Sequence, residues 1–184
     1  MNCTRCNRKD CRTMQTCKAT AFDNEDIKNQ YHHEQKIVQS AAQLVDNGRA
    51  GTLSRLDEII AFAQTMQYSV LGLAYCYGME TEAALVRDRI KKAGISVEAV
   101  SCTVGGVSQK EVNQESQNKN VSCNPLGQAA QLNQAKPGLV ITMGLCLGHD
   151  ILFNRAIEAD VTTLVVKDRV YNHAPLNALK NENN

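Results

Sequence analysis

Eight cysteines in two sets of four constrain this chain more than any other feature of its sequence. The N-terminus lacks the apolar core of a signal peptide, and from this we predict a cytoplasmic protein. Disulfides are disfavoured in a reducing cytosol, so clustered cysteines there more often bind metal or carry out redox chemistry. The first set is Cys3, Cys6, Cys11 and Cys17, and the second is Cys76, Cys102, Cys123 and Cys146.

The apolar pattern predicts an α/β fold in which a Rossmann-like parallel sheet is flanked by helices. Strand-like segments at 68–74, 95–100, 139–143 and 161–166 alternate with helical segments at 81–93, 124–135 and 149–157. Two further helical stretches, 26–45 and 54–66, precede them, and a polar loop spans 109–120. We therefore divide the chain into a cysteine-rich knuckle (1–20), a helical segment (21–67) and a Rossmann-like α/β domain (68–184).

The first set of cysteines is spaced C-x2-C-x4-C-x5-C in a segment with too little apolar material to fold unaided. Structural zinc commonly uses two close pairs of ligands separated by a longer loop, whereas this segment has one close pair and two single cysteines. Short runs of four cysteines also hold [4Fe–4S] clusters, although this spacing matches neither common ferredoxin pattern. We favour an iron–sulfur cluster and keep Zn²⁺ as the alternative.

The second set of cysteines lies near the predicted carboxyl ends of the strands, where open parallel sheets bind ligands. Cys76, Cys102 and Cys146 each follow a predicted strand, and Cys123 precedes the helix that Pro125 opens. Ligands of open parallel sheets bind outside the carboxyl ends of the strands, so we expect these four thiols to converge on a second metal centre. The alternative is four unrelated buried cysteines, because free cysteine is among the most buried residue types.

Residues beside these cysteines are candidates for supporting roles. His149 would act as a proton donor or as a partner of a metal ligand, the alternative being that it caps a helix together with Asp150. Lys167, followed by Asp168 and Arg169, would bind an anionic substrate or offset the charge of a thiolate-ligated cluster, the alternative being a solvated charge triplet. His149 and Lys167 are our candidate catalytic residues. The candidate cofactor-binding glycines, which allow close backbone approach, are Gly78, Gly105, Gly144 and Gly148.

Several classes of function lack support in the sequence. A net charge of +1 gives no broad basic surface for nucleic acid. No apolar run approaches the roughly 20 residues needed to cross a bilayer. No G-x-G-x-x-G or Walker motif follows a predicted strand, which leaves nucleotide binding unsupported. The partners we expect are an electron donor or acceptor, either a protein or a small molecule, while self-association into a homo-oligomer stays open.

Nearly the whole chain resembles a bacterial and archaeal cysteine-rich family that is labelled metal-binding and catalogued as domain of unknown function 1847. The matching segments are the first four cysteines, 123–129 with Leu132 and Asn133, 144–150, and 162–170 with His173 and Pro175. The resemblance implies metal binding and an anaerobic setting, and it implies no particular reaction.

The sequence thus predicts a metalloprotein with two four-cysteine centres, each most compatible with a [4Fe–4S] cluster, that transfers electrons. If all four cysteines of the second set bind the cluster, it has no open iron and serves as an electron carrier. If one does not, an open iron would permit small-molecule reduction or sulfur chemistry, and the protein would be an iron–sulfur-dependent oxidoreductase. The alternatives are a non-redox zinc protein with a structural or interaction role and a metal-free thiol oxidoreductase.

Overall fold

The computed structural model describes residues 2–17 and 20–180, and the chain divides into two compact units, 1–43 and 44–184. Within the part of the chain that the structure describes, every helix is too short or too polar to span a bilayer.

The first unit has almost no apolar core. It contains two 3₁₀ turns, η1 (Cys3–Arg5) and η2 (Asp10–Thr13), then helix α1 (Asn24–Tyr31) and most of helix α2 (Gln35–Val45). Among its described residues, only Ser40 is buried. Because apolar burial does so little here, the knuckle needs another source of order, as its composition predicts.

The single helix predicted over 26–45 is wrong, because the structure has two helices separated at 32–34. Asp23 caps α1 by accepting the Glu25 N–H at 2.7 Å. At the break, the Glu34 N–H donates to Tyr31 O, which is the tighter i to i−3 pattern. Residues 28–34 include Asn and two His, which are weak helix formers, and no residue among them is buried, so packing does not compensate.

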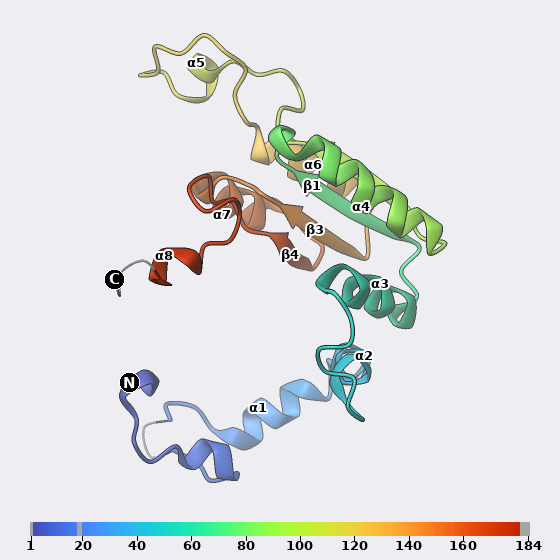
Figure 1. The fold of residues 1–184 in the computed structure, drawn as a ribbon, viewed down its shortest axis with the longest axis vertical. Coiled ribbons are helices and arrows are strands. Elements are labelled where there is room, and N and C mark those ends of the chain that lie inside the picture. Colours follow the sequence, from blue (N-terminus) through green and yellow to red (C-terminus); the bar gives the residue numbers. More distant parts are fainter. Residues whose placement is uncertain (1, 18–19, 181–184) are drawn as a thin grey trace. The chain divides into compact units, whose positions relative to one another are not determined.

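The second unit is a four-stranded, fully parallel sheet with strand order β2-β1-β3-β4, which confirms the predicted α/β class. Figure 1 shows β1, β3 and β4 of this sheet. Its strands are β1 (Val70–Tyr75), β2 (Ser96–Ser101), β3 (Leu139–Met143) and β4 (Val161–Val165). Its helices are α3 (Arg55–Met66), the 3₁₀ turn η3 (Tyr77–Met79), α4 (Glu80–Lys92), α5 (Gln109–Val112), α6 (Pro125–Ala135), α7 (Leu147–Ala156) and α8 (Asn177–Lys180). Every predicted strand is present within two residues of its expected bounds.

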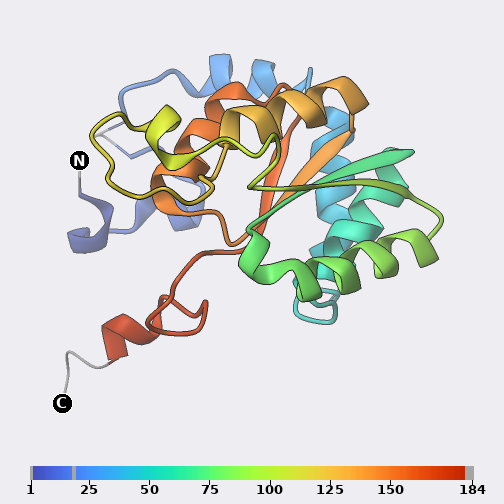
Figure 2. The same ribbon diagram turned by 90° about the horizontal axis from the view of Figure 1, so that it is seen from above.

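Alternation along the strands sends side chains to two separate cores. Leu71 and Leu73 of β1 and Ile141 of β3 pack with α3 and α4 on one face. Ala74 and Val140 pack with α6 and α7 on the other. Figure 2 shows α4 on one side of the strands and α6 and α7 on the opposite side. Both faces of the sheet are covered, as its apolar strands require.

Two short helices were missed in segments expected to be irregular. The loop predicted over 109–120 begins with α5, which has a complete capping box: Ser108 accepts the Glu111 N–H while the Glu111 carboxylate accepts the Ser108 N–H. The polar C-terminal tail contains α8. Both helices are four residues long and bury none of their residues, so neither produces the apolar periodicity that identifies longer helices.

The order of the strands creates a switch point between β1 and β3. From β1 the chain passes through α4 to β2 on one side, and from β3 it passes through α7 to β4 on the other side. At such a point the connections leave in opposite directions, opening a crevice at the carboxyl ends of the strands where ligands bind in open α/β sheets. Cys76 follows β1 and Cys146 follows β3, so two cysteines lie at the crevice.

Candidate metal centres

Main-chain hydrogen bonds join the loops that carry the second set of cysteines. The Cys76 N–H donates to Met143 O at 3.0 Å, which ties the end of β1 to the end of β3. The Cys102 N–H donates to Tyr75 O at 2.9 Å, and the Asn124 N–H donates to Cys102 O at 2.6 Å. The backbone therefore brings the residues beside all four cysteines to one edge of the sheet, independently of any bound group.

The four thiols are neighbours in space. The sulfurs of Cys102 and Cys123 lie 3.5 Å apart, and the Tyr77 N–H donates to the Cys102 sulfur at 3.3 Å. Cys123 interacts electrostatically with both Cys76 and Cys146. Cys76 and Cys102 are buried, whereas Cys123 and Cys146 are half-buried. The site is thus covered on its Cys76–Cys102 side and more accessible on the other.

Two cations from the end of β4 reach the same thiols. The Lys167 ammonium lies 3.1 Å from the sulfur of Cys76, and the Arg169 guanidinium lies 3.2 Å from the sulfur of Cys146. The alternative weighed for 167–169 is a solvated charge triplet, and Arg169 is exposed, but both cations also contact a cysteine sulfur. Lys167 favours the thiolate form of Cys76, and Arg169 places a second positive charge beside the Cys146 sulfur.

The surroundings of Cys76, Cys102 and Cys123 shift the pKa values of their thiols in different directions. Burial, the strongest influence on Cys76, raises its pKa, but the Lys167 ammonium and the Gly78 N–H outweigh burial, and the net pKa is lowered. Burial raises the pKa of Cys102 to about 12, although the Tyr77 N–H opposes it. Burial also raises the pKa of Cys123, with further contributions from Cys146 and Cys76. One edge therefore holds a favoured thiolate beside thiols that resist ionisation.

The raised pKa of Cys102 predicts alkaline destabilisation of the metal-free protein. A thiol in the unfolded chain ionises near pH 9.0, whereas Cys102 in the folded chain ionises near pH 12. Between these values only the unfolded state releases the proton, so stability present below pH 9 falls as the pH rises to 12. We expect chemical unfolding under reducing conditions to show this fall. Cys102→Ala should reduce it, and an identical pH profile in that variant would contradict the assignment.

The predicted cofactor-binding glycines have different surroundings. A side chain at Gly78 would lie 3.8 Å from the Cys76 sulfur, and Gly105, with φ of +83°, lies beside Asn124. Gly144 has φ of +62°, and a Cβ there would overlap the Met79 sulfur. At Gly148, on α7, the place that a Cβ would take has no described atom within 4 Å. Gly78 thus lies beside a thiol, Gly144 leaves room for the Met79 side chain, and a Cβ at Gly148 would meet no described atom.

We predict that Gly144→Ala destabilises the second unit by about 1–3 kcal/mol, because alanine in a left-handed conformation is strained and its Cβ meets Met79. Denaturant unfolding measures the effect. The matched control is Gly148→Ala, which lies in a helix without steric conflict and should be neutral or stabilising by up to about 1 kcal/mol. Equal losses in both variants would contradict the strain assigned to Gly144.

Asn124 and Gln128 organise the site, and the sequence alone did not predict the role of Gln128. The Gln128 amide, fully buried, donates to Tyr75 O at 3.1 Å and to Val100 O at 2.7 Å. The Asn124 side chain donates to Val104 O at 3.1 Å and accepts the Gly127 N–H at 2.9 Å. Helix α6 is therefore fastened to the ends of β1 and β2. The Cys-Asn-Pro-x-Gly-Gln motif was the sequence feature that could have indicated this role. The groups that Gln128 contacts, however, lie far from it in the sequence.

His149 lies in the first turn of α7, three positions after Cys146. Its Nδ1 atom is buried, and no hydrogen-bond partner for it occurs among the described residues. Asp150 donates its N–H to Cys146 O at 2.8 Å, as expected at a helix start. Lys167 contacts a cysteine sulfur, whereas His149 Nδ1 has no hydrogen-bond partner in the described part of the chain. The catalytic role of His149 therefore stays a prediction.

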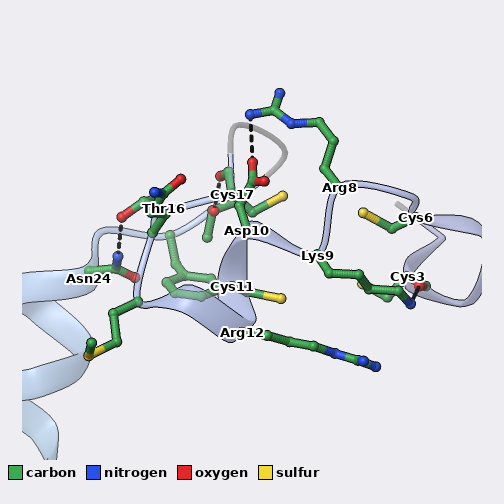
Figure 3. Close-up of a pocket in the computed structure, with 14 residues that line it drawn as sticks. Cys3, Cys6, Arg8, Lys9, Asp10, Cys11, Arg12, Thr16, Cys17 and Asn24 are labelled. Carbon is green, nitrogen blue, oxygen red and sulfur yellow. Dashed lines mark hydrogen bonds and ion pairs between the residues drawn. The ribbon is translucent and has the colours of Figure 1, made fainter.

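The first set of cysteines surrounds a cavity of about 680 Å³ in the N-terminal unit, and Cys3, Cys6, Cys11 and Cys17 all line it. Figure 3 shows the sulfurs of Cys6, Cys11 and Cys17 turned toward the space between them. The backbone N–H groups of Lys9 and Arg8 lower the pKa of Cys6. Backbone N–H groups directed at a cysteine sulfur are a feature of thiolate-ligated metal sites.

In the described part of the chain, neither set of cysteines is arranged closely enough to bind a single metal ion. Among residues 2–17 and 20–180, no group of three or more His, Cys, Asp or Glu side chains is close enough to hold a metal ion. The described cysteines form no disulfides. What the chain supplies is two sets of free thiols, one lining a cavity and the other gathered at a sheet edge.

Comparison with known proteins gives a family and no activity. A family model described as "Protein of unknown function (DUF1847)" matches residues 13–164. A protein of Methanocaldococcus jannaschii, described as "Uncharacterized protein MJ0455", is 35% identical over 185 residues, which cover 97% of this chain and 93% of that protein. No solved structure matches the chain. The matched range includes Cys17 and all four sheet-edge cysteines.

Proposed function

The chain belongs to the DUF1847 family, and we propose that it is an iron–sulfur protein that transfers electrons through two four-cysteine centres. The observation that carries the proposal is the meeting of Cys76, Cys102, Cys123 and Cys146 at the switch point of a parallel sheet. Four thiols from four separate loops, at the edge where such sheets bind ligands, are a donor set that chance burial does not explain.

The chemistry of the donors favours iron–sulfur over a hard cation. Thiolates select soft metals and iron–sulfur clusters, and the described hydrogen-bond partners of these sulfurs are nitrogen atoms and another sulfur. The Tyr77 N–H on the Cys102 sulfur is the kind of hydrogen bond that stabilises sulfur ligands of a cluster. Zinc remains the alternative, since two thiolates on one tetrahedral zinc would lie roughly 3.8 Å apart and Cys102 and Cys123 lie 3.5 Å apart.

The two centres would have different tasks. The N-terminal centre would order a segment that buries almost nothing, and it would exchange electrons with the surroundings because Cys3 and Cys11 are exposed. The sheet-edge centre would hold its electron in a more covered environment, beside Lys167. With all four sheet-edge cysteines as ligands, that centre is an electron carrier.

Lys167 also lines a small cavity of about 100 Å³, together with Thr142, Thr163 and Asp150. A cavity of this size has room for a few waters or a molecule of a few heavy atoms. The described lining of this cavity includes no cysteine, and Lys167 links it to the Cys76 sulfur. If one sheet-edge cysteine is not a ligand, a substrate bound in this cavity and reduced at the cluster would be of that size. Substitution of each cysteine in turn identifies such a residue, because its loss would leave the cluster intact.

Anaerobic purification tests the proposal directly. We expect a brown protein with broad absorption near about 400 nm, typical of cysteine-ligated iron–sulfur centres. Iron and sulfide analysis should account for two clusters, and dithionite reduction should give an electron paramagnetic resonance signal. A colourless protein, prepared without oxygen and containing stoichiometric zinc, would exclude the proposal in favour of the non-redox zinc protein.

One contact favours a second candidate, a thiol oxidoreductase that works without metal. The Cys102 and Cys123 sulfurs, at 3.5 Å, need to approach by only about 1.5 Å to form a disulfide of about 2.05 Å. In that case mild oxidation of metal-free protein should join Cys102 to Cys123 selectively, and peptide mass spectrometry would detect the link. Oxidation that scatters disulfides over many cysteine pairs would count against this candidate.

A further inference from the structure

The loop after β4 is folded tightly around Asp168. The Asp168 carboxylate accepts the N–H groups of Val170 at 2.9 Å and Tyr171 at 2.8 Å. The His173 N–H donates to Asp168 O at 2.8 Å, and the Asp168 N–H donates to His173 Nδ1 at 3.2 Å. All four bonds join Asp168 to residues 170–173 and so fix the turn that carries Arg169. The contact of His173 Nδ1 with Val166 O at 3.2 Å ties this turn to the residue that precedes Lys167.

The two flanking residues are both cations, and both are directed at sulfur. Lys167 reaches Cys76 across 91 positions of sequence, and Arg169 reaches Cys146 across 23. In the part of the chain that the structure describes, neither cation forms an ion pair with a carboxylate. Their charge is therefore not neutralised by acidic side chains and acts on the thiols that follow β1 and β3.

We propose that this loop is an electrostatic clamp in which Lys167 and Arg169 offset the negative charge of the metal-bound thiolates Cys76 and Cys146. The inference rests on the proposed function in requiring a metal centre at the sheet edge. A cluster ligated by four thiolates is anionic, and reduction adds one more negative charge. Two cations in contact with the sulfurs favour the reduced form and raise the reduction potential, because net charge and hydrogen bonds to sulfur set that potential.

The test is a redox titration of the anaerobically purified full chain, followed by electron paramagnetic resonance. In Lys167→Met and in Arg169→Met, we expect the reduced-to-oxidised ratio of the sheet-edge cluster at a fixed potential to fall about tenfold. That change corresponds to a midpoint lower by about 59 mV for one electron. Lys167→Arg keeps the charge and should retain most of the wild-type potential.

The matched control is Arg155→Met, which removes one exposed positive charge from α7. It should leave the potential unchanged, so that a general effect of net charge is separated from the clamp. Arg169 is exposed, so Arg169→Met keeps the test decisive if Lys167→Met fails to fold. Unchanged potentials in both clamp variants, with clusters intact, would overturn the inference while leaving the proposed function in place.

A wild-type protein that contains zinc would distinguish the electrostatic clamp from the proposed iron–sulfur function. It would refute the proposed iron–sulfur function, and the clamp would then be judged by zinc affinity in competition with a chelator. Offsetting of thiolate charge predicts zinc binding about tenfold weaker in Lys167→Met and Arg169→Met than in Arg155→Met. Equal affinities in the three variants, or a wild type whose sheet edge binds neither metal, would overturn the clamp.

Discussion

Cys102→Ser is expected to remove the sheet-edge centre and to leave the N-terminal centre in place. Cys102 is 3% exposed, contacts the Cys123 sulfur and receives the Tyr77 N–H, so it is the most enclosed of the four thiols. Serine preserves the shape but is a poor ligand for soft iron. With two [4Fe–4S] clusters, iron should fall from about eight to about four atoms per chain.

The matched variant is Cys6→Ser, which removes one ligand from the N-terminal set instead. It should also leave about four iron atoms per chain, but the surviving signal in electron paramagnetic resonance should be the one that Cys102→Ser loses. Circular dichroism establishes that both variants are folded. Loss of both signals in either variant would show that the two centres do not form independently, and retention of all iron in Cys102→Ser would show that Cys102 is not a ligand.

Gln128→Ala is expected to destabilise the second unit by about 2–4 kcal/mol, the largest stability effect that we predict for a residue near the site. The substitution opens a cavity in a fully buried position and leaves Tyr75 O without its bond from the side chain, and likewise Val100 O. Denaturant unfolding of the metal-free protein measures the loss without interference from metal binding.

Two further variants separate the contributions to this loss. Gln128→Met fills most of the volume and removes only the hydrogen bonds, so its cost should be smaller than that of alanine. Gln131→Ala, on the exposed side of the same helix, should change stability by no more than about 0.5 kcal/mol. If Gln128→Ala were as mild as Gln131→Ala, the fastening of α6 to β1 and β2 would contribute nothing measurable.

The sequence predicted the features that depend on local pattern. The strands and most helices appeared where apolar periodicity changes, and Cys76, Cys102 and Cys146 were correctly placed after β1, β2 and β3. Pro125 and Asn124 marked the start of α6 because their signals act within a few residues. A general rule for parallel sheets predicted that the thiols would gather at this edge, whereas their binding of one metal centre stays a prediction.

Strand order and the roles of Gln128 and Arg169 depend on long-range contacts, which a single sequence does not reveal. The position of β1 between β2 and β3 depends on which strands pair, and strands carry no sequence label for their neighbours. Gln128 and Arg169 act on groups 53 and 23 positions away, so nothing nearby in the sequence indicates their roles. The break at 32–34 was hidden because polar residues on a surface helix and in a turn look alike.

The two sets of cysteines differ in how much of the chain must be synthesised before each is complete. The N-terminal set lies within the 15 residues from Cys3 to Cys17, and a segment this short could wrap around a metal without the rest of the fold. The sheet-edge set is finished only when β3 has docked beside β1, and its cations arrive only with β4. If both sets bind metal, as we propose, the first centre would form without the sheet, whereas the second would form only after the sheet has folded.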